Sequence, residues 1–233
     1  MKENQESRCE NCIIRELNSL KVLKREELKQ MSDAKESRVV KKGEHLYNEG
    51  ERLKGVYCVR SGTSKVSKTA NSGRDQILKL ATKGAVLGQN AIITGTSSQT
   101  SVIAIEDMEV CFIPKSNIEQ PLQNNLEFNR AIIKKLGADL NNSNNVLVDM
   151  SSKSVRQRLA HLLLYIEENY RTNEEGYLNL VLTRSDMAGI VGTAQELLIR
   201  TLAAFKKEGL IITHGKKIKI ADPKALYSIN EDL

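Results

Sequence analysis

The stretch LTRSDMAGIVGTAQELLIRTLAAFKKEGL, residues 182–210, contains two helix-start signals on either side of one glycine. Thr183 is followed three residues later by Asp186, the spacing of a capping box, in which hydroxyl and carboxylate each bond a free amide at a helix start. Thr193 and Glu196 repeat this spacing directly after Gly192, whose permissive backbone suits a sharp turn. The pattern therefore predicts two helices joined by a short glycine turn, which is a helix-turn-helix.

The second of these helices is predicted to bury one face and to be followed by a hairpin. Leu198, Leu202 and Phe205 recur at helical spacing before Gly209 ends the pattern. The segment GLIITHGKKIKIADP, residues 209–223, then reads as two short strands around a turn at His214-Gly215. A hairpin in this position makes the motif a winged helix-turn-helix, which predicts DNA binding.

The side chains on the outer face of the second helix are the candidates for reading bases, because a recognition helix enters the major groove by its N-terminal residues. These candidates are Ala194, Gln195, Glu196, Ile199 and Arg200. Arginine can pair with guanine, glutamate with cytosine, glutamine with adenine, and an apolar side chain can touch a thymine methyl. Candidates for phosphate contacts, which position the protein without reading sequence, are Thr183, Ser185, Thr193 and Lys216. The alternative is that Glu196 only caps the helix and Arg200 only pairs with it one turn later.

Upstream, glycine punctuates the region from Val39 to Pro114. It recurs at positions 43, 50, 55, 62, 73, 84, 88 and 95, between short segments such as VYCVRSG, QILKLA, SVIAI and EVCFIP. Regularly spaced short strands with turn signals predict an all-β sandwich or barrel. Before it, the apolar spacing in residues 13–35 predicts one or two short amphipathic helices.

A heptad pattern connects these two regions. Its members, spaced 3, 4, 3, 4 and 3 residues apart, are Ile133, Leu136, Leu140, Ser143, Leu147 and Met150. Such a narrow seam, with one polar member, is typical of a helix that pairs with another helix. We therefore expect residues 116–150 to form a dimerisation helix, the alternative being a helix packed on its own domain.

Composition limits the classes of function. The net charge of +6 over 233 residues favours a polyanionic partner, though weakly. No apolar run is long enough to span a membrane and the polar N-terminus lacks a secretory signal, so we expect a cytoplasmic protein. We find no nucleophile–base arrangement, phosphate-binding glycine loop or carboxylate pair, and expect no enzymatic activity. In the cytoplasm the four cysteines, Cys9, Cys12, Cys58 and Cys111, are free thiols, metal ligands or redox sensors rather than structural disulfides.

Together these features resemble the CRP/FNR superfamily of bacterial transcription regulators. The matching stretches are KKGEHLYNEGERLKGVYCVRSGTSKV, KGAVLGQNAI, MEVCFIPKSNIE, the helix-turn-helix and FKKEGLI. The resemblance implies an α+β fold: an N-terminal double-stranded β-roll of the cyclic nucleotide-binding type, a long dimerisation helix and a C-terminal winged helix-turn-helix. It implies a homodimer that binds a palindromic DNA site and contacts RNA polymerase. The expected boundaries are 1–36 for a cysteine-containing helical segment, 37–115 for the roll, 116–150 for the dimerisation helix and 151–233 for the DNA-binding domain.

The resemblance also bears on the signal. Family members that bind cyclic AMP hold its phosphate and ribose with a Gly-Glu pair and a downstream arginine. Here Gly88-Gln89 stands where the Gly-Glu pair would be. The expected arginine is missing from TGTSSQTSV, residues 94–102, and neither arginine nor lysine occurs between Lys83 and Lys115. Because a buried phosphate needs a cationic partner, cyclic AMP is not the expected ligand.

The oxygen-sensing branch instead holds a four-iron cluster with N-terminal cysteines and one at the end of a roll strand. Cys9 and Cys12 in CENC match its C-x-x-C, and Cys111 matches the distant cysteine. The third N-terminal cysteine is replaced by Asn18, and Cys58 is an additional one. The resemblance thus implies an iron–sulfur cluster or another metal on Cys9, Cys12 and Cys111, with Cys58 as the available fourth ligand. Thiol redox switching without metal, or no cysteine function, are the alternatives.

Two other classes of function compete with a homodimeric regulator that senses a redox, metal or small-molecule signal. One is a ligand-binding or protein-interaction module with a non-functional helix-turn-helix. The other is a cyclic-nucleotide-gated enzyme subunit, which the lack of any catalytic segment disfavours.

Overall fold

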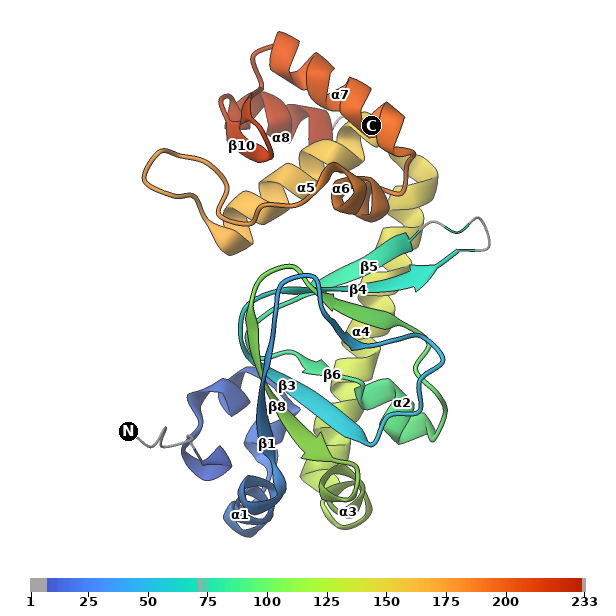
Figure 1. Cartoon of the computed structure of the whole chain (residues 1–233). Helices are drawn as coiled ribbons and strands as arrows, with labels where there is room; N and C mark the ends of the chain where they lie inside the picture. Colours follow the sequence, from blue (N-terminus) through green and yellow to red (C-terminus); the bar gives the residue numbers. More distant parts are fainter. Residues whose placement is uncertain (1–7, 71–72, 74, 232–233) are drawn as a thin grey trace. The chain divides into compact units, whose positions relative to one another are not determined.

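The computed structural model describes residues 8–70, 73 and 75–231, and the chain forms two compact units (Figure 1). The first unit holds the residues before 73 and residues 77–140, and the second holds residues 73–76 and 141–233. None of the helices in the described ranges is long and apolar enough to cross a membrane.

The first unit opens with a helical segment. Three short 3₁₀ turns precede one α-helix: η1 (Cys9–Asn11), η2 (Ile13–Leu17), η3 (Ser19–Val22) and α1 (Arg25–Ala34). The expected amphipathic helices of residues 13–35 are therefore reduced to a single one. The side chain of Asn18 accepts a hydrogen bond from Leu20 N at 2.9 Å, which starts a new turn where an α-helix would continue.

The β-roll consists of two four-stranded sheets. Their strands are β1 (Glu36–Val40), β2 (His45–Tyr47), β3 (Gly55–Ser61), β4 (Ser64–Thr69), β5 (Asp75–Ala81), β6 (Val86–Leu87), β7 (Ser101–Ala104) and β8 (Met108–Pro114). One sheet has the order β1-β8-β3-β6 and the other β2-β7-β4-β5, with α2 (Gln89–Thr94) inserted between β6 and β7. Val56, Val59, Val102 and Val110 are fully buried in the core of this roll.

The range 116–150, expected to be one helix, contains two. They are α3 (Ser116–Asn124) and α4 (Leu126–Ser152). Asn125 separates them in an extended conformation, and its side chain accepts a hydrogen bond from Phe128 N at 3.1 Å. Asn125 thus caps the start of α4, because a helix leaves its first amides without internal partners.

The second unit contains the helix-turn-helix and its wing. Its further elements are α5 (Val155–Tyr170), α6 (Arg184–Val191), α7 (Gln195–Lys207), β9 (Ile211–His214), β10 (Lys217–Ile220) and α8 (Pro223–Glu231). Leu159, Leu163, Leu198, Phe205 and Leu226 are fully buried at its centre. The predicted roll followed by a winged helix-turn-helix is therefore confirmed.

Candidate functional site

The predicted capping box at the start of α6 is present. Thr183 Oγ1 accepts from Asp186 N at 3.0 Å, and Asp186 Oδ2 accepts from Thr183 N at 3.3 Å and from the Thr183 hydroxyl at 2.6 Å. Both donors of Thr183 are thus directed to Asp186, which is only 9% exposed. The box fixes where the first helix begins, while the neighbouring Ser185 is exposed on its surface.

The predicted second capping box is wrong. Ala194, not Thr193, is the N-cap of α7, and no side chain caps that helix. The amide of Thr193 instead donates to Ala188 O at 3.1 Å and so closes the end of α6 around Gly192. Because the Thr193 amide bonds to α6, it does not take part in a capping box, and α7 starts one residue later than the sequence spacing indicates.

Two features of the turn require glycine at position 192: its backbone conformation and the close approach of Met150. Gly192 has φ +69°, a left-handed conformation that disfavours other residues, and a Cβ placed on it would lie 2.7 Å from Met150 Sδ. Met150, expected to belong to the dimerisation seam, therefore packs against the helix-turn-helix turn within the second unit.

The outer face of α7 presents the predicted base-reading residues to solvent. Gln195, Glu196 and Arg200 are exposed, Ile199 is 46% exposed and Ala194 is half-buried. Leu198, Leu202 and Phe205 point the other way and are buried, as predicted. The N-terminal turns of α7 thus combine two charged groups, one amide and one apolar side chain on a single free face.

The wing carries Lys216 at its tip and is anchored by an arginine that no motif in the sequence singles out. His214 pairs with Lys217, so the loop is Gly215-Lys216, one residue later than the predicted turn. Arg184 Nη2 donates to Gly215 O at 3.1 Å, which joins the wing tip to the start of α6.

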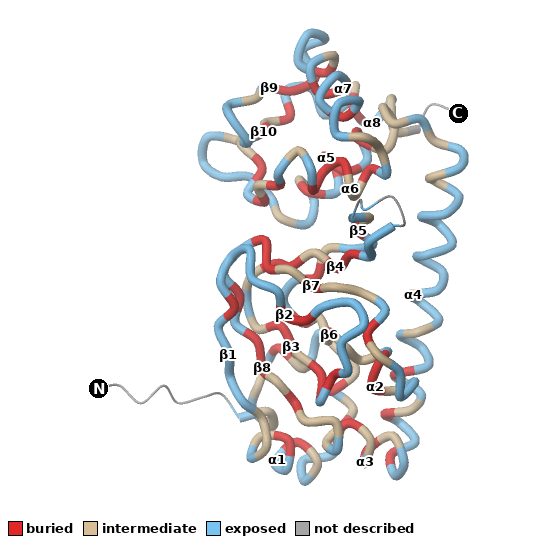
Figure 2. Tube along the Cα trace, turned by 45° about the vertical axis from the view of Figure 1, so that its right-hand side comes forward, coloured by how far each residue is buried: buried red, intermediate tan, exposed pale blue. Residues whose placement is uncertain are grey.

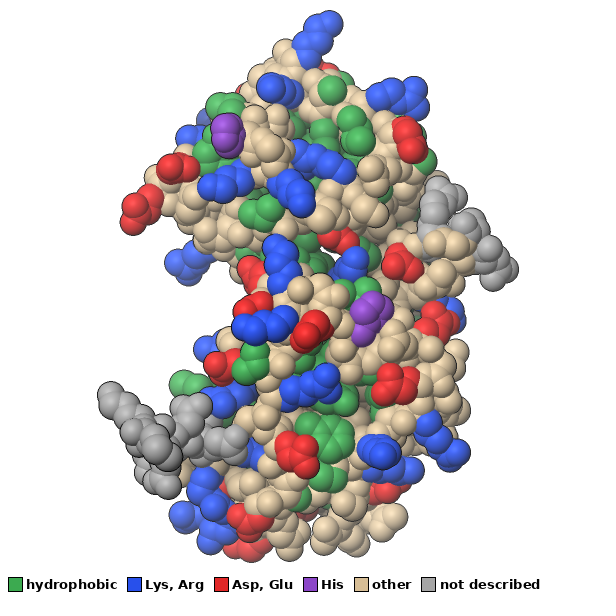
Figure 3. Space-filling view, in the orientation of Figure 1, with side chains coloured by type: hydrophobic (Ala, Val, Ile, Leu, Met, Phe, Trp, Pro, Cys, Tyr) green, Lys and Arg blue, Asp and Glu red, His purple; other side chains and the backbone are tan. Residues whose placement is uncertain are grey.

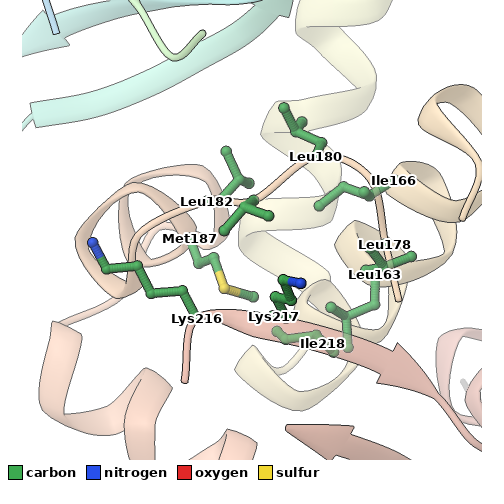
Figure 4. Close-up of a pocket in the computed structure, with 10 residues that line it drawn as sticks. Leu163, Ile166, Leu178, Leu180, Leu182, Met187, Lys216, Lys217 and Ile218 are labelled. Carbon is green, nitrogen blue, oxygen red and sulfur yellow. The ribbon is translucent and has the colours of Figure 1, made fainter. Parts of the chain in front are cut away.

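A small apolar pocket under the wing shows how the wing is supported. Side chains from α5, the loop before α6, α6 itself and β10 converge on it, and among them Met187 extends toward the strand that carries Lys217 and Ile218 (Figure 4). The amine of Lys216 points away from these apolar groups. Lys and Arg side chains also lie over the face of this unit seen in Figure 3, as phosphate binding requires.

Arg158 links the ends of two helices around the helix-turn-helix by donating to three backbone carbonyls. Its Nε donates to Val191 O at 2.7 Å, and its Nη1 donates to Met150 O at 3.4 Å and to Lys153 O. One half-buried guanidinium thus satisfies carbonyls at the ends of α4 and α6, which have no partner within their helices.

Replacing Arg158 with alanine is therefore expected to destabilise the second unit by about 1.5–3 kcal/mol, the usual contribution of hydrogen bonds from a charged donor. Thermal or urea unfolding followed by circular dichroism measures this change. Lys224→Ala, which removes an exposed cation from α8, is the control and should change the unfolding free energy by less than about 0.5 kcal/mol. Equal stability of the two variants would show that the three hydrogen bonds contribute nothing.

Beyond its first two turns α4 is largely exposed (Figure 2), and it carries a stripe of exposed apolar side chains. Ile133, Leu140 and Leu147, each seven residues apart, are 68%, 63% and 67% exposed. Leu136, expected in the same seam, is only partly exposed because it packs against the core of the roll. Large apolar side chains with this exposure are characteristic of a surface that another protein covers.

Cys58 and Cys111 are direct neighbours in the roll. They are paired residues on the antiparallel strands β3 and β8, so their side chains lie on the same face of the sheet. Tyr57 and Phe112, the next pair, lie on the opposite face and their rings contact each other. Cys58 therefore lies on the face of the sheet opposite to the one on which the Tyr57 and Phe112 rings pack.

All four cysteines line one cavity between this sheet and the N-terminal segment. Cys9 and Cys12 come from the 3₁₀ turns, and Cys58 and Cys111 from the strands. Three cations, Arg15, Lys35 and Arg60, line the same cavity, and the other lining residues are Leu20, Leu28, Met31 and Ile113. The sequence could not reveal that Cys58 joins the other three, because this depends on which sheet face the N-terminal segment covers.

The chemistry of this donor set is that of a thiolate site. Burial raises the pKa of Cys58 to about 12 and raises the pKa of Cys9 and of Cys111, although Lys35 partly opposes the change for these two. Thiols with a raised pKa react slowly, which disfavours redox switching by the thiols alone. A bound metal would displace these protons, and the three cations would offset the charge of the resulting thiolates.

A zinc ion and an iron–sulfur cluster place different demands on the sulfurs that hold them. A single zinc ion needs its sulfur ligands about 2.3 Å from one point. Among the described residues, no group of three or more His, Cys, Asp or Glu side chains is placed to hold one ion. An iron–sulfur cluster offers each of four cysteines its own iron, so it spans a wider set of sulfurs. The four thiols that line one cavity, with three cations beside them, match the number and the chemistry of the ligands of such a cluster.

An aromatic and an aliphatic side chain meet the turn at Gly88, where the family resemblance places the cyclic-nucleotide pocket. Tyr47 is buried beside Gly88, with its phenol in hydrogen-bonding range of the Gly88 backbone and of the Thr100 side chain. A Cβ at Gly88 would lie 2.7 Å from Leu53 Cδ1, so Leu53 also contacts this turn. Tyr47 and Leu53 therefore contact the turn at which the phosphate of a cyclic nucleotide would need a cationic partner.

Comparison with known proteins agrees with this architecture. Residues 37–125 match the cyclic nucleotide-binding domain, and residues 157–229 match the Crp-like helix-turn-helix domain. The chain is 24% identical over 232 residues to the transcriptional activator protein Anr of Pseudomonas protegens, covering 98% of this chain and 95% of that protein. It is 26% identical over 226 residues to the fumarate and nitrate reduction regulatory protein of Escherichia coli K12, covering 95% and 89%.

Solved structures show the same fold. A putative transcriptional regulator of the Crp/Fnr family from Eubacterium rectale aligns with a TM-score of 0.79 and 22% identity, over 93% of this chain and all of that one. FixK2 from Bradyrhizobium japonicum aligns with a TM-score of 0.73 and 22% identity, over 85% and 98%. A roll of this type joined to a Crp-like helix-turn-helix defines a DNA-binding transcription regulator. The chain belongs to the CRP/FNR superfamily.

Proposed function

We propose that this regulator is a cytoplasmic homodimer that reads a two-fold symmetric DNA site and whose DNA affinity responds to a cofactor held by thiols. The proposal is carried by one observation: four cysteines from two separate segments line a single cavity beside the roll. The free, polar face at the start of α7 supports the DNA-reading part.

In the DNA-bound dimer, one α7 from each chain enters a major groove, with half-sites about one helical turn apart. Arg200 donates to guanine, Glu196 accepts from cytosine, Gln195 pairs with adenine, and Ile199 and Ala194 make apolar contacts. Ser185, Thr193 and Lys216 contact phosphates. Thr183 lies beside them at the start of α6, where its amide and hydroxyl both donate to Asp186.

Dimerisation is proposed to use α4. Ile133, Leu140 and Leu147 form the centre of the contact, and Leu136 and Met150 contribute their remaining exposed surface. RNA polymerase is the further partner we propose, since a regulator bound at a promoter lies beside it.

The cofactor we propose is an iron–sulfur cluster held by Cys9, Cys12, Cys58 and Cys111. When bound, such a cluster supplies redox chemistry and sensitivity to oxidants. Two of the ligands come from the N-terminal segment and two from β3 and β8. A bound cluster would therefore link the N-terminal segment to the sheet. A signal that changes occupancy then shifts the dimer between conformations with different DNA affinity.

The test is to purify the protein without oxygen and to measure its visible absorbance, iron and sulfide. We expect a brown solution with about four irons per chain. DNA sequences selected from a random pool by the same preparation should be palindromic, and exposure to air should lower their affinity. Colourless protein that stays colourless after incubation with ferrous iron and sulfide contradicts the cofactor. A selected pool without a palindrome contradicts the DNA-reading dimer.

A further inference from the structure

Asn18 is in contact with one of the four cysteines. Its amide nitrogen lies 3.6 Å from Cys58 Sγ, 3.1 Å from Gly84 O and 3.4 Å from Ile14 O. An amide nitrogen carries two hydrogens, so these three acceptors share two donors. Asn18 therefore connects the N-terminal segment to the roll and to the Cys58 sulfur at the same point.

The position of Asn18 is fixed from several sides. Its Oδ1 accepts from Leu20 N at 2.9 Å, which holds the side chain in one orientation. Next to it, Leu17 packs on Gly84, where a Cβ would lie 2.6 Å from Leu17 Cβ. A side chain held this firmly can direct its N–H toward a neighbouring sulfur without a further loss of conformational freedom.

The sulfur that receives this hydrogen bond differs from the others in its surroundings. Cys9 and Cys111 lie near Lys35, and Cys111 also lies near Arg60, whereas the polar group directed at Cys58 is Asn18. A hydrogen bond strengthens when its acceptor becomes a thiolate, because it is then charge-assisted.

From these contacts we infer that Cys58 is the fourth ligand of the metal group and that Asn18 is a positioning residue, donating a hydrogen bond to the Cys58 thiolate. This rests on the proposed function, since it concerns the same thiol cavity. The ligand it requires is a metal–sulfur group, and each thiol releases its proton to solvent on binding.

Two expectations follow. Residue 18 lies beside Cys58, so a thiol introduced at 18 can replace the lost thiol of a Cys58 variant. Loss of the Asn18 donor should lower the reduction potential of the bound group, since a donor stabilises its more negative, reduced form.

The experiment reconstitutes purified full-length protein with ferrous iron and sulfide under nitrogen. Iron per chain, visible absorbance and circular dichroism are measured for wild type, Cys58→Ser and the double variant Asn18→Cys/Cys58→Ser. We expect Cys58→Ser to lose at least half of the iron while staying folded, and the double variant to regain it. Wild-type iron content in Cys58→Ser, or no recovery in the double variant, overturns the inference. Wild type that binds no iron overturns the proposed cofactor itself.

The role of Asn18 is tested separately by redox titration of Asn18→Ala, with Gln30→Ala, which removes an exposed side-chain amide from α1, as the matched control. The midpoint potential should fall in Asn18→Ala and stay unchanged in Gln30→Ala, with equal iron in both. An unchanged potential in Asn18→Ala overturns the positioning role. The redox titration still tests the contact between Asn18 and the Cys58 thiolate if Cys58→Ser fails to fold.

Discussion

Arg200→Ala is expected to abolish sequence-specific DNA binding. Arg200 is exposed on the first turns of α7, where the recognition helix meets base edges. A bidentate arginine–guanine contact provides about 1–3 kcal/mol of discrimination, and a symmetric dimer makes it twice. The loss of about 2–6 kcal/mol corresponds to a reduction in affinity from about 30-fold to about 10⁴-fold.

The measurement compares a palindromic site with an unrelated duplex of equal length, using fluorescence anisotropy at fixed salt. Lys207→Ala removes the same charge from the exposed C-terminal end of α7 and is the control. It should weaken binding to both duplexes equally, because a phosphate contact carries no sequence information. If Arg200→Ala keeps the wild-type ratio between the two affinities, Arg200 is only a partner of Glu196 on the helix surface.

The helix-turn-helix could be predicted from the sequence because its main signals are local. A capping box depends on two residues three positions apart, so Thr183 and Asp186 identified the start of α6 correctly. The start of α7 was missed although the spacing was the same. Thr193 donates its amide to Ala188 O, and this bond forms only once α6 and the turn are in place.

The thiol site shows the opposite limit of sequence reasoning. Strand alternation predicts that Cys58 points to one face of its sheet, but not which face the N-terminal segment covers. Cys58 and Cys111 meet only through the register of β3 and β8, and Asn18 reaches Cys58 across 40 residues of sequence. Likewise, the heptad spacing placed Leu136 with Leu140, and only packing shows that Leu136 lies against the roll.

Placing a charge in the exposed stripe of α4 is expected to separate the dimer. In Leu140→Asp/Leu147→Asp, two side chains that are 63% and 67% exposed in the single chain become anionic. Burying a leucine contributes about 1.5–3 kcal/mol, and each position occurs twice in a symmetric contact. The dimer dissociation constant should therefore rise by at least about 10⁴-fold. Sedimentation velocity at micromolar concentration should give the mass of one chain.

The control places a charge on the opposite side of the same helix. Residue 145 lies away from the line through Leu140 and Leu147 and is also exposed, so Asn145→Asp should leave the dimer intact. The two variants also separate the two readings of the heptad. If the stripe packed on its own domain, the double variant would lower the unfolding temperature and keep the dimer mass. If the stripe is the dimer contact, the folded chain remains but binds only single half-sites, so affinity for the palindrome falls even though Arg200 and the rest of α7 are unchanged.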